Sequence, residues 1–201
     1  MGDYLTLDEA KRWTGVPIAD EQASDLEDAI DAVERQIEHF CQRKFSKTSS
    51  EARDFAASNS TLLRLGPFND LVSVTSVETD TAGDGSFATT ITAYELEPRN
   101  TAGPETRPYT ALRRISGSWP VASSSDARQA LVRITGVWGW SAVPSAVKQA
   151  TRIQVARIFK RTDSPFGVAG FGEFGVVRIG SRLDPDVQHM LDPYRIPAGF
   201  A

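Results

Sequence analysis

A row of apolar residues between residues 20 and 44 constrains the fold of this chain more than any other feature of its sequence. Its members are spaced by four, three, four and three residues, which is the repeat of a helix that packs against a second helix. They are Leu26, Ile30, Val33, Ile37 and Phe40. Acidic residues fill many positions between them, mostly in the N-terminal half, where the helix dipole stabilises negative charge. The row predicts a long helix over about residues 20–44, whose partner helix lies either in the same chain or in a neighbouring one.

A shorter helix is predicted ahead of it. Thr6 and Glu9 have the spacing of a capping box, in which each residue satisfies a backbone N–H group of the other. Leu7, Ala10 and Trp13 then fall on one side of the helix.

From residue 46 to residue 140 the pattern changes to short β-rich runs separated by turns. Five strands are predicted, over residues 62–65, 71–79, 87–96, 110–115 and 131–138. Apolar and polar residues alternate in the last run, as in an antiparallel strand with one buried side. Trp138 and Trp140 are expected to fill the core at its end. The region predicts a small antiparallel sheet or barrel.

Helical spacing returns at residue 143, and Pro144 suits the first turn of a helix. The apolar stripe of this helix is predicted to contain Ala146, Ala150, Ile153, Ala156 and Phe159, flanked by Val147, Val155 and Ile158. A loop rich in glycine and phenylalanine follows. After it we expect a strand over residues 175–179 and a last helix that is capped by Asp184 and stops at Pro193.

These elements predict an α+β fold. Residues 1–45 and 141–201 are expected to form a helical core, and residues 46–140 a small antiparallel β domain inserted into it. The net charge is −6 over residues 1–45, −1 over residues 46–143 and +3 over residues 144–201. A nucleic-acid-binding domain is usually strongly basic. Ends of opposite charge suit a subunit that meets neighbours, although solvated helix faces would give the same pattern.

The composition is that of an ordinary globular protein, with 40% hydrophobic and 24% charged residues. No stretch reaches the roughly 18 apolar residues that span a bilayer, and the N-terminal residues lack the features of a signal peptide. The single cysteine, Cys41, excludes an internal disulfide and is expected to be a small buried residue. We therefore expect a chain made in the cytosol, with no membrane partner.

A search for catalytic chemistry yields no site. His39 and Cys41 are two residues apart on the predicted helix, so their side chains point in different directions and cannot form a dyad. Residues 170–175 match the dinucleotide-binding pattern GxGxxG, but here a helix precedes the glycines and a strand follows them. Asp80 and Asp84 lack the remaining ligands of a calcium loop and fit a hairpin turn better. The sequence predicts no enzyme, no cofactor and no metal.

Three phenylalanines on the glycine-rich loop are the most unusual feature. Phe166, Phe171 and Phe174 could each bury on the order of 150–200 Å². They either fold back onto the chain's own helices or become ordered when the loop docks against a partner.

Several short motifs, taken in order, resemble the head-to-tail connector (adaptor) family of tailed bacteriophages. The motifs are LTLDEA at residues 5–10, FCQRKF at 40–45, TGVWGWSAVP at 135–144, DSPFG at 163–167, DPDV at 184–187 and PY at 193–194. The resemblance spans essentially the whole chain. The predicted β domain is larger than in the smallest, nearly all-helical members of the family, so its role is the least directly inherited.

The resemblance implies a non-enzymatic structural subunit of the virion, assembled in the host cytoplasm. Such subunits form a ring, commonly of twelve copies, beneath the portal protein, where they extend the channel for the packaged DNA and join capsid to tail. The implied partners are further copies of the chain, the portal protein, the next connector or tail-completion protein, and DNA bound without sequence specificity. The residues expected at the interface with the portal or a neighbouring subunit are Phe166, Phe171, Phe174, Val176, Val177, Ile179, Val187, Leu191 and Tyr194.

Three other functions remain open from the sequence. A tail-completion or tail-terminator protein also forms rings but is usually richer in β structure. A DNA-binding regulator could use the terminal helices, although the acidic N-terminal region argues against this. An enzyme with an unrecognised site is the third.

Overall fold

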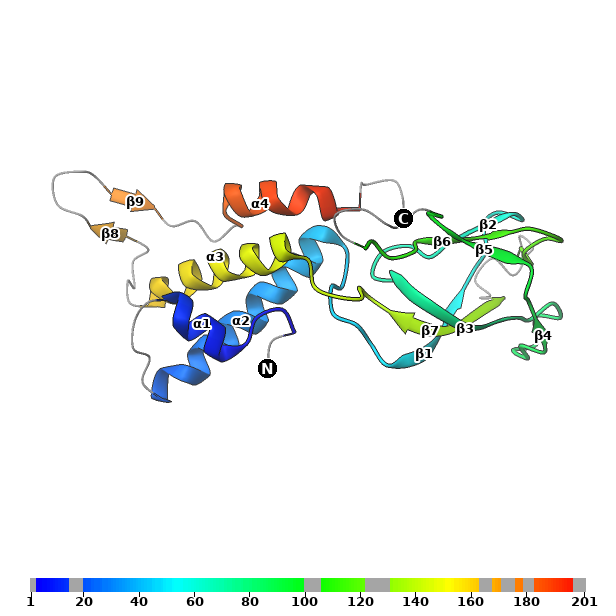
Figure 1. Ribbon diagram of the computed structural model, residues 1–201, viewed down its shortest axis with the longest axis horizontal. Helices are drawn as coiled ribbons and strands as arrows, with labels where there is room; N and C mark the ends of the chain where they lie inside the picture. Colours follow the sequence, from blue (N-terminus) through cyan, green and yellow to red (C-terminus); the bar gives the residue numbers. More distant parts are fainter. Residues whose placement is uncertain are drawn as a thin grey trace. The chain divides into compact units, whose positions relative to one another are not determined.

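The computed structural model describes residues 3–14, 20–99, 106–121, 131–162, 168–170, 176–178 and 183–196, and the contacts below are those of these residues. The predicted α+β fold is confirmed: N- and C-terminal helices form a helical core, into which an antiparallel β domain is inserted (Figure 1). Unit 1 consists of residues 1–42 and 143–196, and unit 2 of residues 43–142. The boundaries predicted from the sequence fall after residues 45 and 140.

Unit 1 is built from helices of both ends of the chain. They are α1 (Leu7–Thr14), α2 (Asp20–Cys41), α3 (Ser145–Thr162), α4 (Pro185–Leu191) and a 3-10 turn, η2 (Asp192–Tyr194). The apolar row of α2 packs against α3 and α1 of the same chain. Leu26, Ile30, Val33 and Ile37 are fully buried. The partner helix that the row requires is therefore internal, and this row offers no apolar seam to a neighbouring copy.

The C-terminal end of α2 differs from the prediction. The helix stops at Cys41 rather than Lys44 because Gln42 adopts a left-handed conformation, with φ of 57°. As expected, Cys41 is a buried residue. Phe40 is only half buried, and the Arg195 guanidinium lies over its ring, 5.2 Å from the centroid.

The structure shows which sides of α1 and α3 are buried. In α1, Ala10 and Thr14 are buried, whereas Trp13 is 47% exposed. In α3, the buried side contains Val147, Ala150, Thr151, Gln154, Val155 and Phe159. Ala150 and Phe159 of the predicted stripe are thus buried, as are Val147 and Val155 of its predicted flank. Ala146, Ile153 and Ala156 of the stripe are only partly buried. In both helices the inward side also includes polar residues, Thr14 in α1 and Thr151 and Gln154 in α3, which hydrophobic spacing alone does not indicate.

Unit 2 contains two antiparallel sheets. One has the strand order β1-β7-β3-β4, formed by Ser50–Phe55, Val132–Trp138, Leu71–Thr79 and Thr89–Thr90. The other has the order β2-β6-β5, formed by Leu62–Arg64, Ala111–Arg114 and Tyr94–Glu97. Two backbone hydrogen bonds between Leu71 and Tyr109, of 2.8 and 2.9 Å, connect the first sheet to the segment leading into β6.

The strand predictions for unit 2 are right in part. Four of the five predicted runs match single strands, but residues 87–96 contain β4 and β5, which belong to different sheets. The sequence also missed β1, because only Phe55 of its six residues is buried and the strand therefore shows no apolar alternation. The strand is positioned instead by its pairing with β7.

A single hydrophobic core joins the two sheets of unit 2. It includes Phe55, Leu63, Leu112, Ile134 and Trp138. Trp138 and Trp140 are buried, as predicted for the end of the last strand. Between them Gly139 has φ of +92°, and a Cβ atom added there would lie 1.9 Å from the Ser46 carbonyl oxygen. Only glycine fits this close crossing of the two backbones.

Part of the segment predicted as a glycine-rich loop forms a strand. β8 (Val168–Gly170) pairs antiparallel with β9 (Val176–Arg178), so the two strands make a hairpin after α3. The strand predicted over residues 175–179 corresponds to β9. β8 and β9 contact mainly each other.

Candidate interaction surfaces

The C-terminal helix α4 is held against α3 by polar contacts at its start. The Asp184 side chain accepts a hydrogen bond from the Asp186 N–H at 2.9 Å, which confirms the predicted cap. The Asp184 carboxylate also pairs with Arg157. The backbone N–H of Asp184 donates to the Gln154 side-chain oxygen at 3.2 Å. Gln154 in turn contacts Gln36 of α2, with 3.3 Å between the side-chain nitrogen and oxygen. Three helices are thus connected through one buried glutamine.

The far end of this segment is attached to α2. The Ile196 N–H donates to the Cys41 carbonyl at 3.1 Å. Val187 and Leu191 are fully buried and Tyr194 is 6% exposed. The interface role predicted for these three residues stays a prediction. In this arrangement their side chains belong to the interior, so a partner would reach them only if α4 moved.

The other predicted interface residues cannot be placed in this way. Phe166, Phe171, Phe174 and Ile179 lie outside the described residues. Val176 and Val177 are in β9, where the strand pairing is described but the side chains are not.

A hollow between α1 and α3 is a surface that the sequence did not predict. It is lined by Glu9, Arg12, Trp13 and Arg152, and is called the Trp13 hollow below. Arg152 pairs with Glu9 across the two helices at 3.4 Å. Because the helices are far apart in sequence, no local pattern could have indicated this site.

Glu9 is fixed in the hollow by the predicted capping box. Its carboxylate accepts hydrogen bonds from the Thr6 N–H at 3.1 Å and the Thr6 hydroxyl at 3.3 Å, and the Glu9 N–H donates to the Thr6 hydroxyl at 3.3 Å. The hydrogen bond from the Thr6 backbone holds the pKa of Glu9 below its ordinary value, and Arg152 and Lys148 add to this effect. Glu9 is therefore a fixed anion beside three cations, namely Arg12, Arg152 and Lys148.

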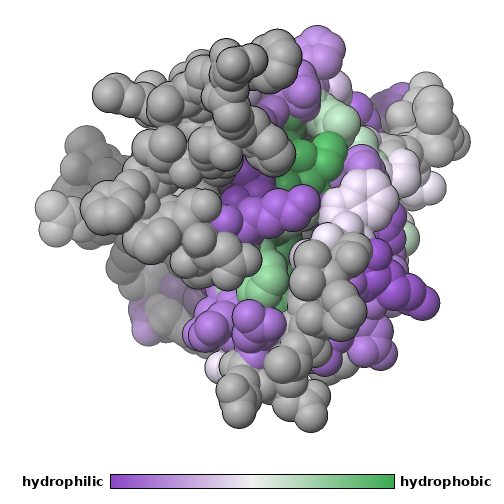
Figure 2. Space-filling model, turned by 90° about the vertical axis from the view of Figure 1, so that its left-hand side faces the viewer, coloured by the Kyte–Doolittle hydropathy of each residue, from purple (hydrophilic) through white to green (hydrophobic). Residues whose placement is uncertain are grey.

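The surface of α2 carries the opposite charge. Asp25, Glu27, Asp28 and Asp31 are all exposed, and together they are called the α2 acidic face below. None of the four forms an ion pair with a described residue. Figure 2 shows hydrophilic side chains, in purple, over much of the described surface on one face of the molecule, with apolar ones, in green, between them near the middle.

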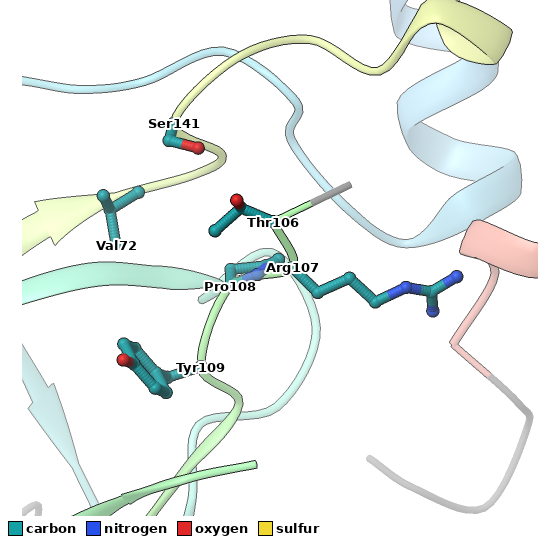
Figure 3. Close-up of a pocket in the computed structure, with 6 residues that line it drawn as sticks. All are labelled: Val72, Thr106, Arg107, Pro108, Tyr109 and Ser141. Carbon is teal, nitrogen blue, oxygen red and sulfur yellow. The ribbon is translucent and has the colours of Figure 1, made fainter. Parts of the chain in front are cut away.

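Unit 2 exposes separate apolar residues and a small hollow. Ile115 and Val121 are 62% and 48% exposed. The hollow has a volume of about 90 Å³ and is lined by Val72, Thr106, Arg107, Pro108, Tyr109 and Ser141. Figure 3 shows that the Arg107 side chain extends away from the other five. A space of this size holds no more than a few water molecules.

The described residues contain no arrangement typical of an active site. No group of three or more His, Cys, Asp or Glu side chains among them could hold a metal ion. Asp80, considered above as a calcium ligand, accepts hydrogen bonds from the N–H groups of Ala82, Gly83 and Gly85. Burial acts to raise the pKa of Asp80, but these backbone hydrogen bonds outweigh it and lower the pKa. The carboxylate thus stabilises a turn, as predicted.

Among the helices in the described part of the chain, none is long and apolar enough to cross a membrane. No protein-family model matches the sequence, and no curated protein is similar to it. Solved structures are similar over nearly its whole length. One is a chain from the neck of an empty gene transfer agent particle, computed with C6 symmetry, with 17% identity and a TM-score of 0.59 over 100% of this chain and 95% of that one.

Two further structures give the same result. A chain in the virion of the native gene transfer agent particle is 16% identical, with a TM-score of 0.54 over 98% of this chain and 94% of that one. A chain in the neck of the native particle, computed with C12 symmetry, is 17% identical, with a TM-score of 0.52 over 90% of this chain and 89% of that one. At these identities the likeness establishes a shared fold.

Proposed function

We propose that this chain is a structural subunit of the neck of a phage-like particle, in the role of a head-to-tail connector (adaptor). In this role, copies of the chain form a ring, commonly of twelve, beneath the portal. The ring extends the DNA channel and joins the capsid to the next connector or tail component. DNA passes through it without sequence-specific contact, and the chain has no catalytic part in the process.

The observation that carries the proposal is the extent of the structural likeness. Two chains from gene transfer agent necks and one from a gene transfer agent virion share the fold over 90% or more of this chain. The match therefore includes both the helical unit and the β unit, rather than one common submotif. The sequence motifs that resemble the connector family are an independent support, because they also run from the first helix to the last.

The symmetry of the similar particles supports the ring. The two neck structures were computed with C6 and C12 symmetry. Rings of this kind require head-to-tail contacts between different surfaces of each copy. A chain with a cationic hollow on α1 and α3 and an anionic face on α2 offers two such surfaces in one unit.

A tail-completion or tail-terminator protein is the second candidate from the sequence. Such proteins are usually richer in β structure. Here helices include about 36% of the described residues and strands about 25%. The helix content favours the connector.

Electron microscopy of the full chain, alone and mixed with portal rings of the same particle, tests the proposal. We expect a ring that binds coaxially at the tail-facing end of the portal. Binding only to the end of assembled tail tubes would favour the terminator instead. No ring and no binding to either component would contradict both functions.

A further inference from the structure

The Trp13 hollow has binding capacity that the chain itself does not use. Trp13 is the only large apolar side chain of unit 1 that is exposed among the described residues, at 47%. An aromatic side chain of this size buries on the order of 150–250 Å² when it is covered. Arg12, beside it, is exposed and forms no ion pair with any described carboxylate. Tryptophan and arginine are the residue types most enriched at the centres of protein interfaces.

No cation in the described part of the chain forms an ion pair with the α2 acidic face. Asp28 lies three residues after Asp25 and three before Asp31, while Glu27 lies four before Asp31. Carboxylates at these spacings are neighbours on a helix surface and repel one another. A partner that brought positive charge to this face would relieve the repulsion.

We infer that the Trp13 hollow of one copy binds the α2 acidic face of the next copy, and that this contact joins neighbouring subunits in the ring. Arg12 and Arg152 pair with the carboxylates, and the neighbouring helix covers Trp13. Both surfaces belong to unit 1, and in one chain no ion pair among described residues connects them. The inference rests on the proposed ring and names the surfaces that would form it.

Charge favours a second copy over DNA as the occupant. A nucleic-acid phosphate and a carboxylate of the α2 acidic face could both pair with Arg12 and Arg152, and both would meet the Glu9 carboxylate in the same hollow. Residues 1–45, which include the α2 acidic face, have a net charge of −6. Duplex DNA carries one negative charge per about 1.7 Å of its axis, so this region repels DNA more strongly than it repels the four carboxylates of the α2 acidic face.

Variants of the hollow test the inference by native mass spectrometry and sedimentation of the full chain, alone and on portal rings. We expect Trp13→Ala and Arg12→Glu each to weaken association between copies by about tenfold or more, since they remove a central contact. Association of the unmodified chain should also weaken as salt rises. Lys47→Glu makes the same charge change on an exposed residue of unit 2 and serves as the matched control.

A charge exchange gives the sharper test. Asp28→Arg alone should weaken association as Arg12→Glu does. A chain with both changes carries an acidic hollow and a more basic α2, so it should associate better than either single variant. Circular dichroism of each variant checks that unit 1 is folded, and a misfolded variant is replaced by Arg12→Gln or Asp28→Asn.

The outcomes separate the inference from the proposed function. If the unmodified chain forms rings and the folded variants form them equally well, the inference is wrong and the connector role stands. If the variants lose affinity for duplex DNA but not for one another, the hollow binds nucleic acid and the inference is also wrong. If the unmodified chain neither self-associates nor binds portal rings, both fail.

Discussion

The two units of this protein hold distant parts of the chain together by different interactions. The described residues of unit 2 all come from one stretch of sequence, residues 43–142, and a hydrophobic core joins its two sheets. Unit 1 is discontinuous, and its two sequence segments are held together by the packing of α1 and α2 against α3 and by polar contacts such as those of Gln154. One unit depends mainly on apolar burial, and the other on burial supplemented by specific hydrogen bonds.

Both units bury carboxylates where a chain segment must be fixed. In unit 2, Asp70 pairs with Arg43 and accepts a hydrogen bond from the Trp140 indole N–H at 2.9 Å. In unit 1, Glu34 accepts hydrogen bonds from the N–H groups of Asp3, Tyr4 and Leu5, at 2.9, 2.8 and 3.4 Å. Asp70 thus closes the two ends of the inserted β unit, whereas Glu34 attaches the N-terminal segment to α2. We therefore expect the loss of Asp70 to lower the free energy of unfolding more than the loss of Glu34 does.

The tryptophans allow the two units to be followed separately. Three of the four, Trp119, Trp138 and Trp140, are buried in unit 2, and Trp13 is exposed in unit 1. Tryptophan fluorescence therefore reports mainly on unit 2, and the helical circular dichroism signal mainly on unit 1. Each prediction below is measured with both signals during urea unfolding.

The largest effect is expected for Asp70→Ala. The change leaves the Arg43 guanidinium, already mostly buried, without its partner, and breaking such a pair costs about 3–5 kcal/mol. We expect the fluorescence transition to move to much lower urea. The control is Asp54→Ala, which breaks the exposed pair with Arg133 and should cost about 1 kcal/mol or less. Equal shifts for the two variants would show that the Arg43–Asp70 pair does not close unit 2.

Gly139→Ala should follow, at about 2–4 kcal/mol, because it combines a left-handed backbone with a steric clash against Ser46. Gly85→Ala is the matched comparison. Gly85 has φ of +86°, but an added Cβ would have nothing within 4 Å, so only the backbone term of about 1–2 kcal/mol applies. If the two variants are equally stable, the close crossing at Gly139 is not a constraint.

A smaller effect is expected for Glu34→Gln in unit 1, at about 1–3 kcal/mol near neutral pH. Both carboxylate oxygens accept from backbone N–H groups, whereas an amide has a single acceptor oxygen and leaves at least one of these groups without its partner. Here the helical signal should shift and the fluorescence should not. A coincident shift of both signals would mean that the two units unfold as one.

Lowering the pH should change the difference in stability between the unmodified chain and Glu34→Gln. Burial raises the pKa of Glu34 above its ordinary value of 4.5, and this outweighs the hydrogen bonds from Tyr4, Asp3 and Leu5. A group with a raised folded pKa contributes stability that is fully present below pH 4.5 and is lost as pH rises through the folded value. The unmodified chain should therefore gain stability relative to Glu34→Gln as pH falls towards 4.5. A constant difference from pH 7 to pH 4 would contradict this.

The smallest effect is expected for Thr6→Ala, which removes the cap of α1 and should cost about 1 kcal/mol. It also removes the hydroxyl group that helps to fix Glu9 in the Trp13 hollow. Thr6→Ser keeps the hydroxyl and should restore most of the stability in the same urea titration. A loss as large for serine as for alanine would locate the effect in the methyl group instead.

The sequence predicted the individual helices and strands of this fold better than the contacts between elements far apart in the chain. The capping box of α1, the cap of α4 and the apolar row of α2 were all indicated, because each depends on residues within a few turns of one another. β1 was missed because its pairing with β7 joins residues about 80 positions apart. The candidate hollow was missed for the same reason, since Trp13 and Arg152 meet only when α1 packs on α3.

The sequence by itself determined the order of helices and strands and the insertion of a β region between helical ends, because hydrophobic spacing and caps act locally. Only the tertiary structure decided which face of each helix turns inward. Spacing shows which residues share a side, but the side that is buried depends on the partner, and partners here come from opposite ends of the chain. That choice placed the apolar row of α2 inside the protein and left Trp13 at the surface.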